Sequence, residues 1–446
     1  MGKVFGSLIL VLSILAWTPQ SYGSACFIPL ESPQYSDRNG IVRTPIPTQV
    51  AQEIDDAQKI LMRIPNRVVI YGDPGTDRGL PTLAAKLGAK GFSTLVSEGR
   101  TTSHFKNLTS PEPVIQFKHS FAAKLVNIHG SSGLIFQPGG VETLNALFQA
   151  MTLIQTKKLE KRPIVLLGSR YWSGLENFIK ETLAKEKTIA PDDVNLFHIT
   201  DSIEEAVEFI DSHRPDTFGQ YRVQPGLPWV SGAEIEKEML AGKDVIDRLE
   251  QELGRPIISV SAFGGARIPR GKPAYNLSVD LSGRLAPRGI TIITGGGPGI
   301  MEAYNRGAKE KNQPTVGFNI ELPWEQKPNE YIDPKHLYTF KYFEPRKTNL
   351  IYHADAIIVN FGGYGTMEEF FEPLALMSTG EIPRKPILLL GGRWKALLDA
   401  LRIHMRVELP NDVVFLDVPE VTPPELNGEL EREVLKALKY AAHVLK

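Results

Sequence analysis

ADAIIVNFGGYGTMEEFFEPLALMSTGEIPRKPILLLGGR, residues 354–393, combines in order a short apolar run, a glycine-rich turn, a stretch of helix length and a second apolar run. The two apolar runs, residues 356–359 and 387–390, show no alternation of polar and apolar side chains. Runs of this kind are typical of parallel strands that are buried on both faces of a sheet. This one segment therefore predicts the strand, turn, helix and strand of an α/β fold.

The same order of features occurs earlier in the chain, in SSGLIFQPGGVETLNALFQAMTLIQTKKLEKRPIVLLGSR (residues 131–170). The two segments align without a gap when one is shifted by 223 positions, which places Gly139 on Gly362. Chance matches seldom keep register over this length while they also preserve the hydrophobic pattern, so we infer a tandem duplication. The repeat is far too long for a solenoid. Further identical pairs keep the shift, among them Thr143 and Thr366, Phe148 and Phe371, Pro163 and Pro386, and Arg170 and Arg393.

Each half of the chain alternates strand-like apolar runs with helical stretches, which predicts a doubly wound parallel sheet in each half. A stretch that contains proline and glycine, DTFGQYRVQPGLPWVSG (residues 216–232), favours a join between the halves. We therefore expect one domain at residues 26–215, a linker at 216–244 and a second domain at 245–446. The predicted strands lie at residues 67–72, 94–98, 133–137 and 163–168, and at 257–265, 291–297, 356–363 and 386–392.

Composition limits the classes of function. The 446 residues are enough for two domains, and 42% apolar with 23% charged residues describes an ordinary globular protein. The net charge of −1 does not favour binding of a nucleic acid polymer, which is a polyanion. A single cysteine excludes an internal disulfide and a cysteine-rich zinc site.

The N-terminal stretch MGKVFGSLILVLSILAWTPQSYGSAC has one lysine followed by an apolar run at residues 4–17, which is short for a membrane span of about 20 residues. We expect residues 1–25 to be a secretory signal, with Gly23 and Ala25 as the small residues before the cleavage site. Cys26 would then be the first mature residue, as in a lipoprotein, although lipid-attachment sites usually carry leucine where Gly23 stands. The sequence thus predicts export, either as a soluble periplasmic protein or as a lipoprotein anchored in the membrane at Cys26. An uncleaved anchor and a misassigned start codon stay open.

Two glycine-rich turns follow predicted strands in the C-terminal half, within TIITGGGPGIMEAYNRGAKE (residues 291–310) and AIIVNFGGYGTMEEFF (residues 356–371). Parallel sheets bind ligands beyond the carboxyl ends of their strands, where helix N-termini point and glycine amides can approach an anion. Glycines that only form tight turns are the alternative. Neither turn has the spacing of a Walker loop or of a dinucleotide fingerprint. The candidate phosphate-binding residues are Gly295, Gly296, Gly297, Gly299, Gly362, Gly363, Gly365 and Thr366.

Two glutamates, Glu368 and Glu369, come directly after the second turn. Acidic residues near a helix N-terminus usually complement the helix dipole. However, a carboxylate beside a phosphate-binding turn is electrostatically unfavourable unless it has a task. Hydrolysis of an N-glycosidic bond supplies one, because its transition state is cationic at the sugar carbon and water must be oriented there.

The pattern G-G-x-G-T-x-x-E at residues 362–369 resembles the P-G-G-x-G-T-x-x-E motif of the LOG family, with Phe361 in place of proline. These proteins are cytokinin riboside 5′-monophosphate phosphoribohydrolases, often labelled lysine decarboxylases. The family also carries an Arg-Lys pair on the preceding helix, which Arg346 and Lys347 match. TGGGPGIMEAYNRGA and GFNIELPWEQKPNEYI look like the larger bacterial relatives, which hydrolyse nucleoside 5′-monophosphates to free base and ribose 5-phosphate. The resemblance covers most of residues 255–400.

The resemblance implies an α/β fold of two Rossmann-like doubly wound parallel-sheet domains related by internal duplication. It implies a hydrolase acting on a nucleoside 5′-monophosphate with a purine or cytokinin-type base, without metal or cofactor. Arg346 and Glu369 would be the catalytic pair, supported by Lys347 and Glu368. An exposed helix arginine is the alternative for Arg346. Phe361 is expected to change only the stiffness of the turn, because proline there acts entropically.

The N-terminal half lacks most of these residues. Lys124 keeps the match to Lys347, and Gly139 and Gly140 keep the start of the turn. Family members are dimers with active sites near the subunit contact, so the resemblance implies that this half is an inactive partner in an intramolecular pseudo-dimer. A homo-oligomer and a regulatory nucleotide site in this half stay open. Three motif positions are replaced, with Ala123 at the position of Arg346, Glu142 at that of Gly365 and Ala146 at that of Glu369.

Two other functions remain as alternatives, besides a purely structural scaffold. The first is a non-catalytic nucleotide-binding or cofactor-binding carrier protein of the same fold, because molybdenum-cofactor carriers are similar to it. Retention of both Arg346 and Glu369 argues against a pure binder, which has no need of that carboxylate. The second is a lysine decarboxylase, but nothing in the sequence looks like a lysine site for pyridoxal phosphate.

Overall fold

The computed structural model describes residues 35–36, 42–43, 45–64, 66–72, 80–98, 103–107, 115–213, 230–323, 327–418 and 424–444. The expected signal peptide, Cys26 and residues 216–229 of the expected join lie outside the described residues. Within the described ranges, no helix combines the length and the apolar character needed to cross a membrane.

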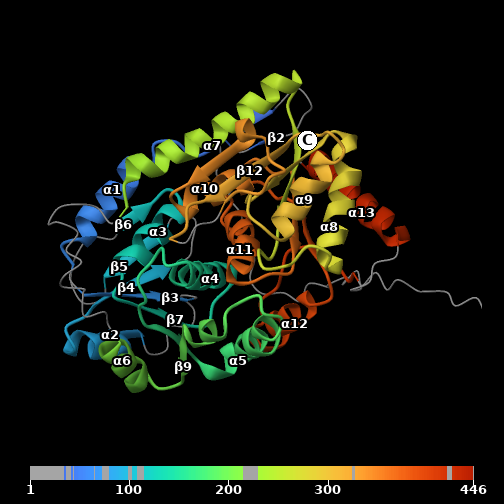
Figure 1. Ribbon diagram of the computed structural model, residues 1–446. Coiled ribbons are helices and arrows are strands. Elements are labelled where there is room, and N and C mark those ends of the chain that lie inside the picture. The colour runs from blue at the N-terminus through green and yellow to red at the C-terminus, as the bar shows by residue number, and fades with distance from the viewer. Residues whose placement is uncertain are drawn as a thin grey trace, which may run out of the picture. The chain divides into compact units, whose positions relative to one another are not determined.

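The C-terminal half is built on seven strands, which are β10 (Ile258–Phe263), β11 (Ile290–Thr294), β12 (Thr315–Ile320), β13 (Leu337–Phe340), β14 (Ala356–Asn360), β15 (Ile387–Leu390) and β16 (Val413–Leu416). They form one sheet in the order β13-β12-β11-β10-β14-β15-β16, and each pair of neighbours is parallel (Figure 1). The chain builds outward from β10 in one direction and from β14 in the other. The topological switch point, where ligands of doubly wound sheets bind, therefore lies between β10 and β14.

Helices cover both faces of this sheet, which explains why its strands are apolar without alternation. Ile358 packs in a core with α8, α9 and α13, whereas its neighbours Ile357 and Val359 pack in the core that α10 and α11 share. Proline at the first position of α8 suits a helix start, since its missing N–H would have no helical partner there. The helices of this half are α8 (Pro273–Leu285), α9 (Ile300–Lys309), α10 (Phe343–Tyr352), α11 (Tyr364–Ser378), α12 (Trp394–Asp399) and α13 (Pro424–Val444).

The N-terminal half forms a second seven-stranded sheet from β3 (Arg67–Tyr71), β4 (Ser93–Glu98), β5 (Ser103–Asn107), β6 (Ile115–Phe117), β7 (Gly133–Phe136), β8 (Ile164–Leu167) and β9 (His198–Thr200). The order is β6-β5-β4-β3-β7-β8-β9. Its helices are α1 (Val50–Leu61), α2 (Leu80–Ala89), α3 (Ser120–Gly130), α4 (Val141–Gln155), α5 (Ser169–Phe178) and α6 (Ile203–Ser212).

One edge of this second sheet departs from the prediction of a purely parallel sheet. The neighbours from β4 to β9 are parallel, but β5 pairs antiparallel with β4, and β6 pairs antiparallel with β5. Only residues 99–102 connect β4 to β5, whereas α9 lies between β11 and β12 in the other half. A parallel pair needs a crossover of a dozen or more residues, so this short connection allows only a hairpin.

Local geometry confirms the duplication. Helices α4 and α11 each contain 15 residues and start 223 positions apart, at Val141 and Tyr364. The residues that precede them, Gly140 and Gly363, have nearly identical dihedrals, with φ −86° and ψ −158° in one and φ −87° and ψ −157° in the other. The first glycine of each turn is equally constrained, because a Cβ there would overlap the threonine of its own turn, Thr143 or Thr366.

The C-terminal part of the expected linker is helical. Residues 232–253 form the long helix α7 (Gly232–Leu253), which begins where the Ser231 side chain accepts a hydrogen bond from the Glu234 amide. Helix α7 packs against α1 of one half and α10 of the other, and residues 32–446 form one compact unit. The expected linker boundary at residue 244 therefore falls inside a helix, because amphipathic periodicity continues through it.

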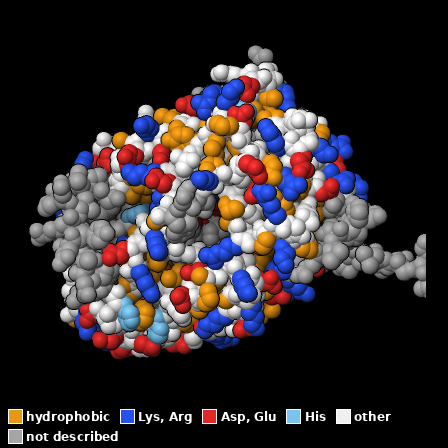
Figure 2. Space-filling view, viewed as in Figure 1, with side chains coloured by type: hydrophobic (Ala, Val, Ile, Leu, Met, Phe, Trp, Pro, Cys, Tyr) orange, Lys and Arg blue, Asp and Glu red, His pale blue; other side chains and the backbone are white. Residues whose placement is uncertain are grey.

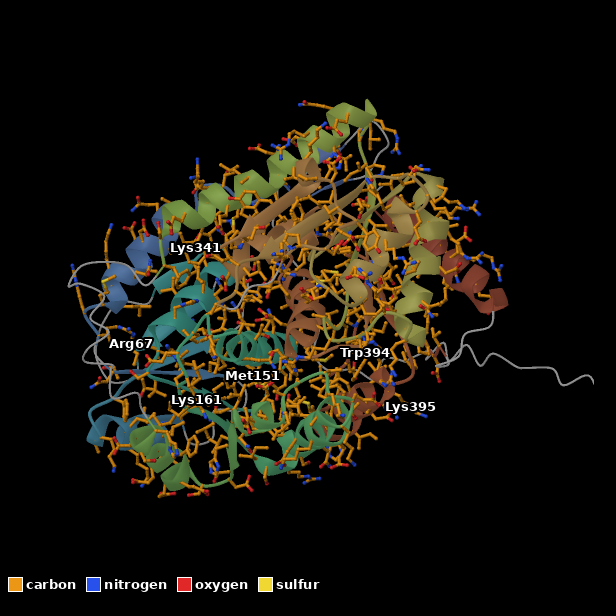
Figure 3. All side chains as sticks on the ribbon, in the orientation of Figure 1. Arg67, Met151, Lys161, Lys341, Trp394 and Lys395 are labelled. Carbon is orange, nitrogen blue, oxygen red and sulfur yellow. The ribbon has the colours of Figure 1, made fainter. Side chains whose placement is uncertain are left out.

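The two halves meet along α4 and α11, which lie side by side (Figure 1). Their facing side chains are mainly apolar. Met151 of α4 is fully buried, and Trp394 at the start of α12 is buried as well (Figure 3). On the face of the molecule shown in Figure 2, basic and acidic side chains are interspersed, in keeping with the net charge of −1.

Candidate functional site

Three turns meet at the carboxyl ends of β10, β14 and β11. The turn after β10 links the other two, because the Gly265 amide donates to the Phe361 carbonyl at 3.2 Å and the Gly265 carbonyl accepts from the Ile300 amide at 3.2 Å. This meeting point coincides with the topological switch point of the sheet. The sequence analysis identified two of these turns and missed the role of Gly265, although Gly-Gly directly after a strand-like run was a usable signal.

Glycine is needed where these turns approach one another and Arg346 most closely. Gly299 has a φ of +71°, and a Cβ on it would overlap the carbonyl groups of Gly265 and Ala266. A Cβ on Gly295 would collide with the guanidinium of Arg346 and with the Met301 sulfur. The turn after β11 therefore has glycines because neighbouring backbone and the arginine occupy the space that side chains would need.

Asn329 holds the turn after β11 in place. Its backbone N–H donates to the Gly296 carbonyl at 2.9 Å, and its side-chain Nδ2 donates to the Gly297 carbonyl at 3.0 Å. The Gly296 amide donates to the hydroxyl of Thr294 at 3.0 Å. Since that N–H is already engaged, we expect Gly296 to support the turn rather than bind phosphate directly. Asn329 was not identified from the sequence.

Arg346 lies on α10 and is 5% exposed, so the alternative of an exposed helix arginine is wrong. Its Nε donates to the Phe318 carbonyl at 2.8 Å, which orients the guanidinium. Its Nη1 lies 3.1 Å from Oε1 of Glu369. The structure thus places the two expected catalytic residues in direct contact.

Glu369 lies in the second turn of α11, and the first turn of this helix contains no acidic residue. A role in complementing the helix dipole is therefore disfavoured, since that effect falls off within the first turn. Burial raises the pKa of the Glu369 carboxyl, while Arg346 and Lys347 oppose the shift. Pro373, four residues later, has no N–H to donate to the Glu369 carbonyl, so the helix is locally weakened at this glutamate.

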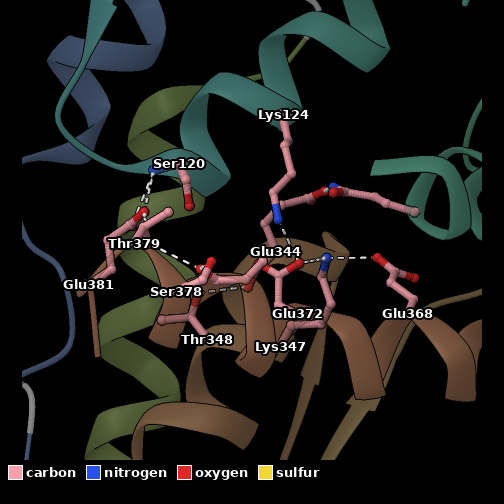
Figure 4. A network of polar contacts seen from close by, with 12 residues as sticks. Ser120, Lys124, Glu344, Lys347, Thr348, Glu368, Glu372, Ser378, Thr379 and Glu381 are labelled. Carbon is pink, nitrogen blue, oxygen red and sulfur yellow. Dashed lines mark hydrogen bonds and ion pairs between the residues drawn. The ribbon is translucent and has the colours of Figure 1, made fainter. Parts of the chain in front are cut away.

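Lys347 and Glu368 form a buried ion pair behind Arg346 and Glu369, with 2.7 Å between Nζ and Oε1. Burial raises the pKa of Glu368 to about 7, and the ammonium of Lys347 opposes this shift. Lys347 has a raised pKa because surrounding carboxylates outweigh the effect of its burial. Figure 4 shows that Glu372 lies next to Lys347 and contacts Lys124 from the other half. Glu372 was not predicted from the sequence.

The turn after β14 faces the N-terminal half. A Cβ on Gly363 would lie 2.5 Å from the Thr188 carbonyl oxygen, and one on Gly365 would lie 3.8 Å from the Thr152 methyl carbon. Part of the candidate phosphate site is therefore bordered by residues of the other half. The resemblance implied a site near the contact between the halves, but the sequence did not show which residues border it.

Phe361, which stands where the family motif has proline, does more than change the stiffness of the turn. Its ring packs edge-on against Trp394, with centroids 5.8 Å apart, and against Phe178 of the N-terminal half, with centroids 6.2 Å apart. A proline ring lacks the area for both contacts. The substitution thus adds aromatic packing between the halves, which corrects the expectation from the sequence.

The equivalent region of the N-terminal half contains a small cavity. The described residues that border this cavity of about 40 Å³ include Tyr71, Lys124 and Glu142 and, from α11 of the other half, Ala375. Glu142 accepts a hydrogen bond from Ser378 of α11, and burial raises its pKa to about 7. Within the described part of the chain, no cluster of His, Cys, Asp or Glu could hold a metal ion.

The fold and the buried arginine–glutamate pair beside glycine turns define a duplicated Rossmann-like α/β protein. A family model described as "Possible lysine decarboxylase" matches residues 93–210 and 301–409, one segment in each half and together just over half of the chain. The chain therefore belongs to this family, which is the LOG family that its motifs resemble.

Curated relatives carry a more specific name. A probable cytokinin riboside 5′-monophosphate phosphoribohydrolase of Oryza sativa subsp. japonica, LOG4, is 31% identical over 140 residues, which are 30% of this chain and 58% of the relative. The Arabidopsis thaliana enzyme LOG3 is 28% identical over 144 residues, 31% of this chain and 65% of the relative. The chain thus spans less than two thirds of the length of these two relatives.

Solved structures of similar fold include a molybdenum cofactor carrier protein of Chlamydomonas reinhardtii, which is 19% identical with a TM-score of 0.30, covering 41% of this chain and 99% of the other. A molybdenum cofactor binding protein of Rippkaea orientalis is 20% identical with a TM-score of 0.30, covering 40% and 98%. Likenesses at this level carry no argument about function.

Proposed function

We propose that the protein hydrolyses the N-glycosidic bond of nucleoside 5′-monophosphates and releases a free base and ribose 5-phosphate. The observation that carries the proposal is the buried ion pair of Arg346 and Glu369, 3.1 Å apart, beside the turns at the switch point of the sheet. The curated relatives, which are named as phosphoribohydrolases, support the same reaction class.

The turn from Gly362 to Thr366 is proposed to bind the 5′-phosphate. It continues into the first turn of α11, a helix of 15 residues whose N-terminus favours an anion through its free amides and its dipole. The hydroxyl of Thr366 can add a donor. A phosphate held there leaves the sugar near Glu369, which lies one turn further along the same helix.

Glu369 is proposed to act on the sugar carbon C1′. As the bond from C1′ to the base nitrogen breaks, positive charge develops on the sugar, and a nearby carboxylate stabilises it. The same carboxylate orients a water molecule, whose oxygen bonds to C1′ as the bond from C1′ to the base nitrogen breaks. The proton that the water loses passes by way of the Glu369 carboxylate to the departing base nitrogen, so the base leaves neutral and the carboxylate is regenerated. Arg346 holds the carboxylate in place, and its fixed guanidinium suits a phosphate or a departing base.

We also propose that the two halves form an intramolecular pseudo-dimer in which the N-terminal half completes the surroundings of the site. Tyr364, the first residue of α11, donates its hydroxyl to the Asp193 carbonyl at 3.0 Å. Arg267, in the turn region after β10, donates to the Thr188 carbonyl at 3.2 Å. Both contacts join a turn of the site to the N-terminal half.

The decisive experiment is incubation of the full chain with AMP, GMP, CMP, UMP and IMP, followed by detection of free base and ribose 5-phosphate. Release of both products from at least one nucleotide is expected. Binding of a nucleotide without release would instead favour the non-catalytic carrier, and a visible cofactor band would point to a pyridoxal enzyme. The panel also identifies the preferred base.

A further inference from the structure

Lys124 keeps the family lysine in the half that has lost the catalytic pair, and its ammonium reaches into the other half. Its Nζ lies 2.7 Å from Oε2 of Glu372 on α11, and the two side chains are only 10% and 4% exposed. Figure 4 shows the Lys124 side chain extending from α3 toward this glutamate. The contact is a buried ion pair between halves.

Glu372 connects this lysine to the candidate site. The same oxygen, Oε2, lies 3.5 Å from Nζ of Lys347, and that ammonium lies 2.7 Å from Oε1 of Glu368. Lys347 and Glu368 directly neighbour Arg346 and Glu369 in the sequence. A continuous line of alternating charges thus runs from the N-terminal half to the residues beside the proposed catalytic pair.

Lys124 supplies one of the two ammonium groups that offset the buried carboxylates of this cluster. Glu344 also faces Lys347, and it is held by the side-chain amide of Gln149 at 2.6 Å. Without Lys124, three buried carboxylates would share the single ammonium of Lys347. Burial alone would raise the pKa of Glu372, but Lys124 and Lys347 hold it at about 2. Removal of one partner from a buried ion pair is strongly destabilising because the remaining charge is uncompensated.

We propose that Lys124 is a positioning residue for the reaction in the other half. It neutralises Glu372, so that the ammonium of Lys347 stays on Glu368 and α11 keeps Glu369 against Arg346. The catalytic part of this inference rests on the proposed function, whereas the coupling of charges between the halves does not.

The repeat supplies a natural control for the coupling. At the shift of 223 positions, Gln149 is the equivalent of Glu372, so the fold accommodates the neutral amide at this position. Glu372→Gln removes the anion that needs Lys124. The ionisable groups that face this network are Lys124 of α3, Glu142 of α4, Glu344, Arg346, Lys347 and Tyr352 of α10, Glu368, Glu369 and Glu372 of α11, and Glu381 after it.

Thermal unfolding of the full chain tests the coupling without any assay of activity. The depressed pKa of Glu372 contributes stability that is present above the pKa of the unfolded chain, about 4.3, and is lost as the pH falls toward 2. In Lys124→Met the folded pKa of Glu372 rises, so this stability is lost at higher pH. We expect the Tm difference between wild type and variant to be larger at pH 8 than at pH 4.5. The difference between Glu372→Gln and the double variant should change less with pH, because only the pKa values of Glu142 and Glu381 then still respond to Lys124. A pH-independent Tm difference for Lys124→Met overturns the coupling.

The pH profile of kcat/KM tests the positioning role. Lys124→Met should lower kcat/KM at least tenfold. It should also move the acid limb of the profile, where activity is lost as the pH falls, to higher pH, because Lys347 then shifts from Glu368 to Glu372. Lys124→Arg should keep most activity, and Lys124→Met with Glu372→Gln should regain it. If Lys124→Met fails to fold, the double variant Lys124→Met with Glu372→Gln still tests the positioning role, since it should fold and turn over substrate.

Lys385→Met is the matched control. Lys385 is equally buried and donates to the carbonyls of Ile351, Tyr352 and Ala354, so its loss should lower stability without moving the acid limb. An acid limb of Lys124→Met that coincides with wild type overturns the positioning role. Wild-type protein that cleaves no nucleotide overturns the proposed function and the catalytic part of this inference together, while the unfolding experiment still decides the coupling.

Discussion

Phe148 and Phe371 stack on each other with ring centroids 5.5 Å apart and planes 7° apart. They are equivalent residues of the two halves, related by the shift of 223 positions. In an isologous contact a residue that touches its own equivalent lies at the two-fold axis. The pair therefore marks the centre of the contact between α4 and α11, as expected for the pseudo-dimer that we propose.

Replacement of the proposed catalytic carboxylate should separate binding from turnover. We expect Glu369→Gln to lower kcat by at least about 10²-fold, because neither the cationic sugar nor the water is then stabilised. Nucleotide binding, measured by calorimetry, should remain. Glu310→Gln, at an exposed position after α9, serves as the control and should behave as wild type. Unchanged turnover in Glu369→Gln would remove this residue from the mechanism.

The phosphate should be essential for recognition. An empty anion site loses several charge-assisted hydrogen bonds, each worth about 1.5–3 kcal/mol, so kcat/KM for adenosine should be at least about 10²-fold below that for AMP. Initial rates with both compounds measure the ratio. Similar values for the two would mean that the glycine turns only shape the chain.

Activity should fall on the acid side at a higher pH than an ordinary glutamate predicts. The pKa of Glu369 is raised by burial, and the ionised form is the active one in our proposal, so activity is lost as the pH falls through this raised pKa. Arg346→Gln removes the guanidinium that opposes the shift, so its acid limb should lie at still higher pH. A pH profile of kcat/KM for both proteins measures this. An acid limb below about pH 4.3 in wild type would contradict the assignment.

Replacement by alanine should cost different amounts of stability at two equivalent glycines. Both Gly140 and Gly363 precede a helix, so both variants lose the same capping preference, about 1 kcal/mol. A Cβ on Gly363 would lie 2.5 Å from the Thr188 carbonyl oxygen, whereas one on Gly140 meets nothing within 4 Å. We expect Gly363→Ala to cost about 1–3 kcal/mol more than Gly140→Ala in urea unfolding. Equal costs would show that the halves do not pack closely at this turn.

The C-terminal half should not behave as a normal monomer on its own. Residues 230–446 expressed alone would expose the apolar face of α11, including Phe371 and Leu374, which are buried in the whole chain. We expect this fragment to aggregate or to pair with itself, as light scattering would show. A soluble, monomeric and fully active fragment would refute the pseudo-dimer and leave the N-terminal half as a separate module.

Much of the fold could be predicted from short stretches of sequence. Strands buried on both faces show as uninterrupted apolar runs, so the two sheets could be predicted. The shift from Gly139 to Gly362 keeps this pattern in register, so the duplication could be predicted as well. Arg346 and Glu369 were predicted through the resemblance of their motifs to those of the LOG family. The structure brings them into contact because α10 and α11 flank the same strand, β14, on one face of the sheet.

Contacts between distant segments could not be predicted in this way, because residues far apart in the chain meet only after the sheets have formed. Lys124 reaches Glu372 across 248 positions, and Phe361 packs on Phe178, yet neither pair has a local signature. Sequence periodicity reports which face of an element is apolar, but the partner of that face depends on how helices close over the sheet. The sequence therefore predicted an inactive partner for the C-terminal half but not its contacts. Folding places its lysine, its Thr188 carbonyl and its aromatic rings against the turns and helices of the candidate site.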